Sequence, residues 1–384
     1  MHEKPSLVAL FSGGGTGGHL YPALALADAL VALRPDVRPF FVGAQRGIEA
    51  RVLPQRGVEH ALVPVLGFAR GSVLSNWRMV PALLRSVLQV NALFRRLRPS
   101  LAVVTGGYAS APSGLVAALR GVPLVVQEQN SVPGFTTRLL ARRARQIHVA
   151  FPEAADRLPA GARARVVLSG NPIQPPVAVD RREARGAFGL AHEGLMVLVV
   201  GGSQGSAALN AAVLEAVRRV VHGESPLPAG LQLLWSTGTN HIDSVRVMLA
   251  DLGAPAWVHA VDFIIDMPRA LAAADLAVSR AGAMATSEFL AWGLPSVLVP
   301  LPTAAANHQE HNAAALAAAG AALHLPEREL TGERLWSTIE GLAVDPGRLE
   351  AQRKAARERG RPESASRIAA ALVDLLPPPP GGVR

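Results

Sequence analysis

Several features are missing from these 384 residues, and each absence narrows the possibilities. There is no cysteine, which excludes disulfides, thiolate zinc sites and cysteine nucleophiles. No uninterrupted apolar stretch reaches the roughly 18 residues of a membrane span, although apolar residues make up 49% of the chain. The N-terminal segment MHEKPSLVALFSGGG has no small-residue cleavage site, so we interpret it as a first strand rather than a signal peptide and expect a cytoplasmic protein.

Lysine and aromatic residues are also scarce. The formal net charge of +9 comes almost wholly from arginine, because Lys4 and Lys354 are the only lysines. Such an excess of positive charge favours phosphate-bearing partners or anionic lipid surfaces. Nucleic acid is the rival partner, but aromatics are only 4% of the chain and it has no helix-turn-helix, zinc-finger or RNA-binding signature, so we expect no nucleic-acid partner.

What is present is an alternation of apolar strands and helical stretches, in a chain long enough for two domains of roughly 100–200 residues. Continuous apolar runs predict parallel strands covered on both faces. In the first half we predict strands at 7–11, 40–42, 101–105 and 124–127 and helices at 22–33, 76–97 and 112–119. In the second half we predict strands at 196–200, 231–235, 257–260, 275–279 and 295–300, with a first helix at 208–220.

The opening module occurs twice, the second time after the proline-rich stretch 170–180. LVALFSGGGTGGHLYPALALADAL and MVLVVGGSQGSAALNAAVLEAV both consist of a strand, a glycine turn carrying Thr16 or Ser203, and a helix. We therefore predict an α/β fold of two Rossmann-like, doubly wound parallel-sheet domains facing across a cleft. We place the N-terminal domain at 1–172, the C-terminal domain at 173–355, a helix at 360–375 that packs back on the first domain, and a disordered tail at 376–384.

The first glycine turn has competing interpretations. Gly13, Gly15 and Gly18 match the dinucleotide fingerprint G-x-G-x-x-G, yet no acid ends the next strand, and Glu49 lies further along, in the next helix. No Gly-Lys-Ser/Thr follows, so the turn is not a Walker loop. A tight strand-to-helix connection without a ligand is the structural alternative. The second turn, GGSQGS at 201–206, favours phosphate binding at two helix N-termini.

Three further segments follow strands on the same side of the sheets: GGYASAP (106–112), QEQN (127–130) and SRAGAMATSE (279–288). Each has two interpretations. Tyr108 could bind substrate or pack in the fold, and Glu128 and Asn130 could be site residues or caps of the following turn. Glu288 could bind a ligand or complement a helix dipole.

Taken together and in this order, GGGTGGH, GGYAS.P, QEQN, GNP, GGSQG, SRAGA...SE and NHQ.HNA resemble the MurG family of peptidoglycan glycosyltransferases, part of glycosyltransferase family 28. The resemblance implies a GT-B fold and an inverting transfer of GlcNAc from UDP-GlcNAc to the muramoyl 4-hydroxyl of undecaprenyl-diphospho-MurNAc-pentapeptide, which converts lipid I to lipid II. It implies no metal or other cofactor, in agreement with the lack of an Asp-x-Asp motif. The implied setting is peptidoglycan synthesis, and so cell-wall biogenesis, cell shape and cell division, at the cytoplasmic face of the cell membrane.

The resemblance also implies site residues. In the C-terminal domain it implies Ser203 near the phosphates, Ile264 beside the uracil and Gln309 at the donor sugar. Glu288 is implied at the ribose, where one carboxylate can accept from two vicinal hydroxyls. The remaining implied nucleotide contacts are Ala283, Met284, Ala285, Thr286 and Ser287. From the N-terminal domain, the implied sugar contacts are Thr16, Gly17, Gly18 and Asn130.

The chain departs from the family pattern at two positions. Family members commonly carry arginine in GNPVR as a pyrophosphate contact, whereas Gln174 follows GNPI here and cannot supply that charge. Arg280 and Arg138 are candidates to replace it. The family usually has HEQN where this chain has Gln127.

An inverting transfer needs a base that takes the proton of the acceptor hydroxyl. His19 is our first candidate, because imidazole titrates near neutrality and the glycine turn leaves room for a sugar. Glu128 is the second candidate, as the base or as the partner that orients His19. The alternative role of His19 is to bind the acceptor diphosphate at the helix N-terminus.

A lipid acceptor requires contact with a membrane, and segment 68–90 is typical of an interfacial amphipathic helix. We predict contact through Trp77 and Leu84, flanked by Arg78 and Arg85. The alternative is a packed surface helix.

Other functional alternatives are a different GT-B UDP-sugar enzyme, such as a glycolipid synthase or a UDP-GlcNAc epimerase, and a nucleotide-binding protein without turnover. Other cell-wall synthesis proteins are possible partners.

Overall fold

The computed structural model describes residues 7–67, 79–202 and 204–379, and the chain divides into two compact units. Unit 1 comprises residues 1–174 and 363–384, and unit 2 comprises residues 175–362. We expected the second domain to begin at 173 and the returning helix to begin at 360. The chain therefore leaves unit 1 for unit 2 once and comes back for its last residues.

The sheet of unit 1 is parallel throughout, in the order β3-β2-β1-β4-β5-β6-β7. The order reverses between β1 and β4, which is where ligands bind in open parallel sheets. Its strands are β1 (Leu7–Ser12), β2 (Val37–Ala44), β3 (His60–Val63), β4 (Leu101–Val104), β5 (Leu124–Glu128), β6 (Gln146–Val149) and β7 (Val166–Leu168).

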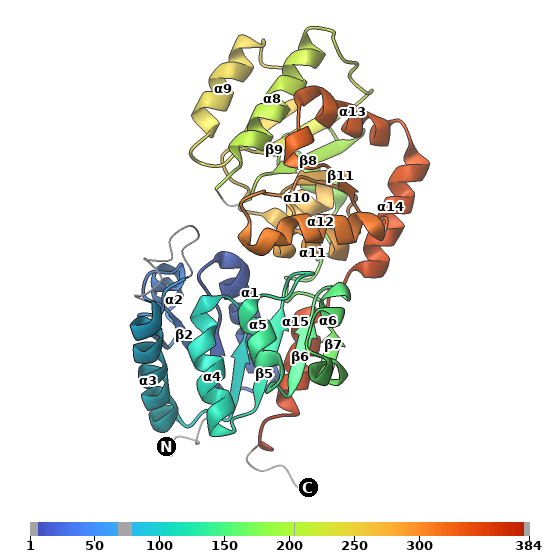
Figure 1. Ribbon diagram of the computed structural model, residues 1–384. Helices are drawn as coiled ribbons and strands as arrows, with labels where there is room; N and C mark the ends of the chain where they lie inside the picture. The colour runs from blue at the N-terminus through green and yellow to red at the C-terminus, as the bar shows by residue number, and fades with distance from the viewer. Residues whose placement is uncertain (1–6, 68–78, 203, 380–384) are drawn as a thin grey trace. The chain divides into compact units, whose positions relative to one another are not determined.

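Helices cover both faces of this sheet, because alternate strand residues point to opposite sides. Leu10 and Val104 face one core, which includes side chains of α3 (Met79–Leu97), α4 (Ala111–Arg120) and α5 (Phe135–Ala141). Phe11 and Val103 face the other, which includes side chains of α1 (Gly17–Leu33), α2 (Glu49–Gln55) and α15 (Ser364–Val373). Figure 1 shows α3, α4 and α5 side by side in front of the strands. The short helices of unit 1 are η2 (Tyr108–Ser110), α6 (Glu153–Asp156) and η3 (Ala160–Arg165).

Strands β3, β6 and β7 were not predicted, and the start of α1 and the end of the chain also differ from the sequence prediction. Helix α1 begins at Gly17 rather than Pro22, so Pro22 lies inside it. Pro22 has no N–H to donate to the carbonyl four residues back, and the early start places His19 in the first helical turn. At the other end of the chain, Leu376 is only 8% exposed and the Pro377 carbonyl accepts hydrogen bonds from Arg34, so packing in unit 1 continues past the position where we expected the tail to begin.

Unit 2 repeats the plan with a parallel sheet in the order β10-β9-β8-β11-β12-β13. Its strands are β8 (Met196–Val200), β9 (Gln232–Ser236), β10 (Val258–Val261), β11 (Leu276–Ser279), β12 (Ser296–Leu298) and β13 (Leu323–His324). Helices α8 (Ala207–Val221), α9 (Ile242–Asp251) and α13 (Gly332–Ala343) pack against Val197, Val199 and Trp235 on one face. The remaining helices are α7 (Arg181–Gly186), α10 (Met267–Ala273), α11 (Ala283–Trp292), α12 (His308–Ala318), α14 (Pro346–Arg359), η4 (Ala305–Asn307) and η5 (Glu327–Glu329).

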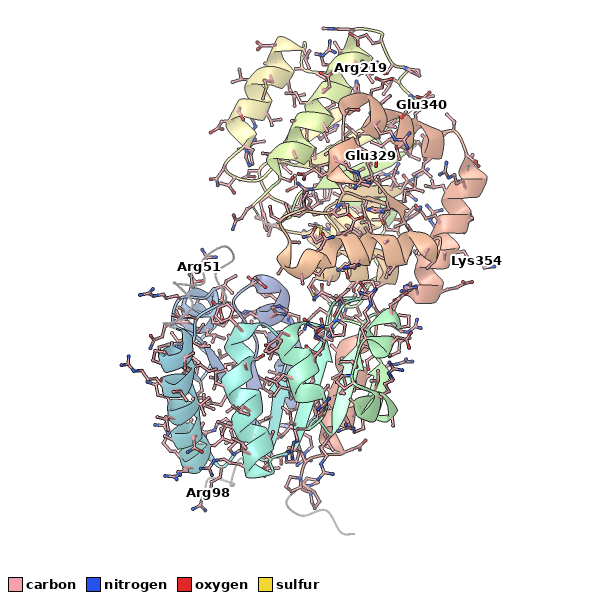
Figure 2. The ribbon with its side chains drawn as sticks, viewed as in Figure 1. Arg51, Arg98, Arg219, Glu329, Glu340 and Lys354 are labelled. Carbon is pink, nitrogen blue, oxygen red and sulfur yellow. The ribbon has the colours of Figure 1, made fainter. Side chains whose placement is uncertain are left out.

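Much of the positive charge lies on the surface. Figure 2 shows Arg51 and Arg98 of unit 1 and Lys354 of unit 2 projecting outward, and all three are exposed. Among the described residues, the buried exceptions are Arg34, Arg185 and Arg280. Among the described residues, no helix combines the length and apolarity that crossing a bilayer requires.

Candidate functional site

The first glycine turn joins β1 to α1 at the switch point of unit 1. Its glycines are needed because neighbouring side chains approach the backbone closely: a Cβ on Gly13 would overlap the Thr105 hydroxyl, and one on Gly14 would overlap the Glu49 carboxylate. Thr16 and Gly18 are exposed and Gly17 is half-buried. Thr16 occupies the N-cap position of α1, yet its side chain makes no capping hydrogen bond. The turn therefore presents an uncapped helix N-terminus beside His19.

His19 is held by one ring nitrogen. Its Nδ1 lies 3.0 Å from the Thr105 carbonyl oxygen and 2.9 Å from Gln129 Oε1. A carbonyl oxygen can only accept, so Nδ1 carries the proton and Nε2 of the neutral ring keeps its lone pair. Among the described residues, none is bonded to Nε2. The half-buried ring is thus placed to accept a proton from a ligand.

Glu128 faces away from this histidine. One of its oxygens accepts from the Asn130 backbone N–H at 3.0 Å and the other from the Gly134 backbone N–H at 3.0 Å, and the residue is 2% exposed. The Asn130 side chain also donates to it at 3.3 Å. Glu128 thus caps the turn after β5 and holds Asn130 at the rim, while Gln129, which the sequence did not single out, is the side chain that orients His19.

Tyr108 lies on the other side of the turn, with its ring against Gly15 and Gly67. It is half-buried. Burial, and then the charge of Glu49, raise the pKa of the Tyr108 hydroxyl above its ordinary value, so the hydroxyl is a donor at neutral pH. Tyr108 therefore packs the glycine turn and keeps a polar tip.

Glu49, which the sequence placed only in the helix after the second strand, lies against the first glycine turn. It is completely buried, and its Oε1 accepts from the backbone N–H groups of Gly15 at 2.8 Å and Ala44 at 3.3 Å. Gly14, Gly43 and Gly47 all leave room for this carboxylate. The signal was the pair of glycines, Gly43 and Gly47, in GAQRGIE, a segment that starts with the last two residues of β2.

In unit 2 the second glycine turn leads into α8, and Ser203 within it lies outside the described residues. Ser206 caps α8 by accepting from Leu209 N at 3.3 Å, and it also accepts from Arg280 Nη2 at 2.7 Å. Arg280 is 8% exposed, donates to the Val299 and Pro300 carbonyls at 3.2 Å each, and pairs with Glu327 at 2.5 Å. Arg280 therefore connects the turn after β8 with the end of β11, and its charge is already balanced.

The expected nucleotide contacts lie in the first turns of α11. Thr286 is buried, and its hydroxyl donates to carbonyls within its own helix. The half-buried members of the set are Ala283, Met284, Ala285, Ser287 and Glu288. Desolvation raises the pKa of the Glu288 carboxyl to about 7, so its charge changes near neutrality.

The other expected contacts differ in accessibility. Ile264 is only 3% exposed, so its side chain belongs to the core, whereas Ile265 beside it is 93% exposed. Gln309 is half-buried and accepts from Leu301 N at 3.0 Å. Gln174 and Arg138 are both exposed, and Gln174 is the residue at which the chain leaves unit 1.

The segment predicted to touch a membrane is described only in part. Trp77 and Arg78 lie outside the described residues. Leu84 is 59% exposed on α3, beside exposed Arg85. Val80 and Leu88 continue the row one turn to either side at 62% and 67% exposure. This helix therefore carries an exposed apolar row, while Val87 packs against the core.

Comparison with known proteins agrees with this architecture. The glycosyltransferase family 28 N-terminal domain matches residues 9–149, and the C-terminal domain of the same family matches residues 196–368. A relative from Moorella thermoacetica, named UDP-N-acetylglucosamine--N-acetylmuramyl-(pentapeptide) pyrophosphoryl-undecaprenol N-acetylglucosamine transferase, is 41% identical over 96% of this chain and 98% of its own. A protein of the same name from Salinibacter ruber is 42% identical over 95% of this chain and 96% of its own. The crystal structure of Acinetobacter baumannii MurG has a TM-score of 0.77 at 27% identity, covering 96% of this chain and 100% of that one. Because this likeness extends through the glycine turns of both units, the chain belongs to glycosyltransferase family 28, within the MurG family.

Proposed function

We propose that this chain transfers GlcNAc from UDP-GlcNAc to the muramoyl 4-hydroxyl of undecaprenyl-diphospho-MurNAc-pentapeptide, with inversion at the sugar carbon, and so converts lipid I to lipid II. The observation that carries the proposal is 41% identity, over 96% of the chain, to a relative whose name states this transfer. The free Nε2 of His19 beside an uncapped helix N-terminus supports it independently.

Unit 2 binds the nucleotide in this proposal. Ionised Glu288 accepts the ribose hydroxyls, and the N-termini of α8 and α11 face the diphosphate, since helix N-termini favour negative charge. Arg280 holds the α8 turn in place through Ser206. Because Arg280 is paired with Glu327, backbone N–H groups rather than this guanidinium carry most of the charge of the leaving group.

Unit 1 binds the acceptor and supplies the base. His19 Nε2 takes the proton of the 4-hydroxyl while that oxygen forms a bond to the anomeric carbon. The bond from that carbon to the diphosphate breaks at the same time, and UDP leaves with the electron pair. In this proposal Asn130 and the backbone of Gly17 and Gly18 contact the sugars, and the hydrogen bonds from Asn130 to Glu128 support a fixed position for Asn130.

The membrane-facing surface consists of α3, α4 and α5 of unit 1. Besides the row on α3, Leu119 of α4 and Phe135 of α5 are 74% and 75% exposed. Arg85, Arg120 and Arg138 on the same helices are exposed and suit anionic headgroups at the cytoplasmic face. Replacing Leu84 and Leu88 together with Ser should reduce co-sedimentation with anionic phospholipid vesicles several-fold. The matched control is Leu33→Ser on α1, which is 50% exposed on the other side of the sheet. Equal binding by the two variants would count against this surface.

One assay tests the reaction. The protein is incubated with UDP-GlcNAc and a short-chain lipid I analogue, and UDP and the disaccharide lipid are quantified. We expect stoichiometric formation of both, and a loss of kcat of about 10²–10⁴-fold in His19→Ala. An unchanged kcat in His19→Ala would reject the base assignment while leaving the transferase assignment intact.

The alternatives predict other products. UDP release without the acceptor would indicate a hydrolase, and interconversion of UDP-sugars an epimerase. Transfer to diacylglycerol would indicate a glycolipid synthase. UDP-GlcNAc binding without turnover would indicate a sensor. The names of the close relatives favour none of these.

A further inference from the structure

Behind His19 lies a closed set of buried amide hydrogen bonds. Gln127, Gln129 and Asn171 are each at most 1% exposed. Gln129 Nε2 donates to the Thr105 carbonyl at 2.7 Å and to Gln127 Oε1, and Gln127 Nε2 donates to Asn171 Oδ1 at 2.9 Å. Asn171 Nδ2 donates to the Gln129 carbonyl at 3.1 Å, which closes the ring. Three motifs meet here: the end of β4, the QEQN turn and the GNP segment.

The direction of every bond in this set follows from backbone carbonyls, which only accept. The Gln129 carbonyl requires the nitrogen of Asn171, so Asn171 presents its oxygen to Gln127. Gln127 then presents its own oxygen to Gln129, whose nitrogen is also required by Thr105 O. The only remaining group, Gln129 Oε1, faces His19 Nδ1 and accepts its proton. Reversing any amide would place two oxygens or two N–H groups against each other, at a cost of about 1–3 kcal/mol for each group left unsatisfied.

We propose that Gln129 is a positioning residue for the transfer, and that Gln127 and Asn171 act through it by fixing the direction of its amide. The network holds His19 with the proton on Nδ1 and the lone pair on Nε2. The groups of the network are neutral, and the Gln129 oxygen accepts from Nδ1–H both before and after Nε2 takes the acceptor proton. Gln127, where the family usually carries histidine, supplies one acceptor and one donor with a single allowed orientation. This inference rests on the proposed role of His19 as the base.

The first test needs no turnover. Nitrogen-15 NMR of the imidazole, with His19 assigned by its loss in His19→Gln, should show the proton on Nδ1 in the free protein. Gln129→Met keeps the volume and removes the acceptor, so Nδ1–H exchange with water should become faster and the Nε2–H form should increase. A wild-type ring protonated on Nε2, or a Gln129→Met protein with an unchanged ring signal, would overturn the proposal whatever the activity.

Kinetics provide the second test. In Gln129→Met we expect kcat to fall about 10–100-fold, within the range of general-base effects, with the KM for UDP-GlcNAc changed by less than about twofold. The acid limb of the pH profile should move to lower pH, because the imidazolium has lost an acceptor. Loss of UDP affinity together with kcat, with no movement of the acid limb, would indicate a merely structural role and reject the proposal.

A double-mutant cycle tests the chain of amides. Asn171→Leu touches no atom of His19, and we expect about a 3–10-fold loss of kcat that disappears in the Gln129→Met background. Additive losses would reject transmission through Gln129. The matched control is Gln146→Leu, which removes a half-buried amide bonded to another histidine, His148, in the neighbouring strand. Its kcat and pH profile should equal those of the wild type, and thermal unfolding of all variants reports whether unit 1, which contains every substituted residue, is folded.

Discussion

The Glu49 carboxylate accepts a hydrogen bond from the backbone N–H of Gly15 at 2.8 Å. In the dinucleotide fingerprint such turn N–H groups receive a pyrophosphate, and here an internal anion takes one of them. The match to G-x-G-x-x-G in the sequence is therefore formal. The glycines leave room for Thr105 and Glu49, and the exposed donors are those at the start of α1.

Removing this carboxylate should destabilise unit 1. Glu49→Ala leaves the Gly15 and Ala44 N–H groups without an acceptor in a cavity, and we expect a loss of about 2–4 kcal/mol in the free energy of unfolding. Glu49→Gln keeps an acceptor oxygen and should lose less. Denaturant titration measures both, and faster hydrogen exchange at the Gly15 amide locates the effect. The control Glu59→Ala removes an exposed ion pair with Arg38 and should cost less than about 1 kcal/mol. Equal losses of stability in Glu49→Ala and Glu59→Ala would contradict the conclusion that Glu49 stabilises the glycine turn.

Binding of UDP should depend on pH through Glu288. Its pKa is raised to about 7, and only the ionised form accepts from two hydroxyls, so affinity should increase as pH rises through 7. Between pH 6 and pH 8 the expected change in Kd is about 10-fold if binding requires the ionised form. The phosphate of UDP titrates near pH 6 as well. Calorimetry on Glu288→Gln measures how Kd changes with pH through the phosphate alone. If Kd changed with pH equally in the variant and the wild type, Glu288 would not be a ribose contact.

Acid should destabilise unit 1 through His148. This residue is 1% exposed between Ser169 and Gln146, and desolvation lowers the pKa of its imidazole to about 4. The unfolded chain binds a proton below about 6.5 while the folded chain does not, so stability falls as pH decreases from about 6.5 towards 4, by up to about 3 kcal/mol. His148→Gln should unfold with a flatter pH dependence over this interval. The same slope in both proteins would show that another group is responsible.

Two ion pairs on helix α7 should differ greatly in their effects. Arg185, with a side chain 2% exposed, donates to Asp275 at 2.7 Å, whereas Arg182 and Glu193 pair at 2.6 Å with side chains 71% and 80% exposed. Asp275 also accepts from Met196 N at 2.8 Å. Asp275→Ala leaves a buried charge uncompensated and should cost unit 2 about 3–5 kcal/mol. Arg182→Ala should cost less than about 1 kcal/mol. Thermal unfolding of the two variants gives the comparison, and similar melting temperatures would contradict it.

The central strands and the glycine turns were predictable from local pattern. The predicted strand 196–200 coincides with β8. The corresponding strand before the first glycine turn, β1, begins at Leu7 as predicted. The missed strands β3, β6, β7 and β13 are short, and a buried histidine in the middle of β6 interrupts its apolar pattern. The start of α1 was predicted at Pro22, five residues after its actual start at Gly17.

The sequence by itself determined the doubled strand–turn–helix plan and the family, because these follow from motifs and their order along the chain. Only the tertiary structure decided which side chains face one another. It paired His19 with Gln129 rather than Glu128, turned Glu49 back under the first glycine turn, and balanced Arg280 with Glu327. These partners lie tens of residues apart in the chain. Parallel strands bring their carboxyl ends together whatever the sequence distance between them, so no local pattern could have predicted the pairs.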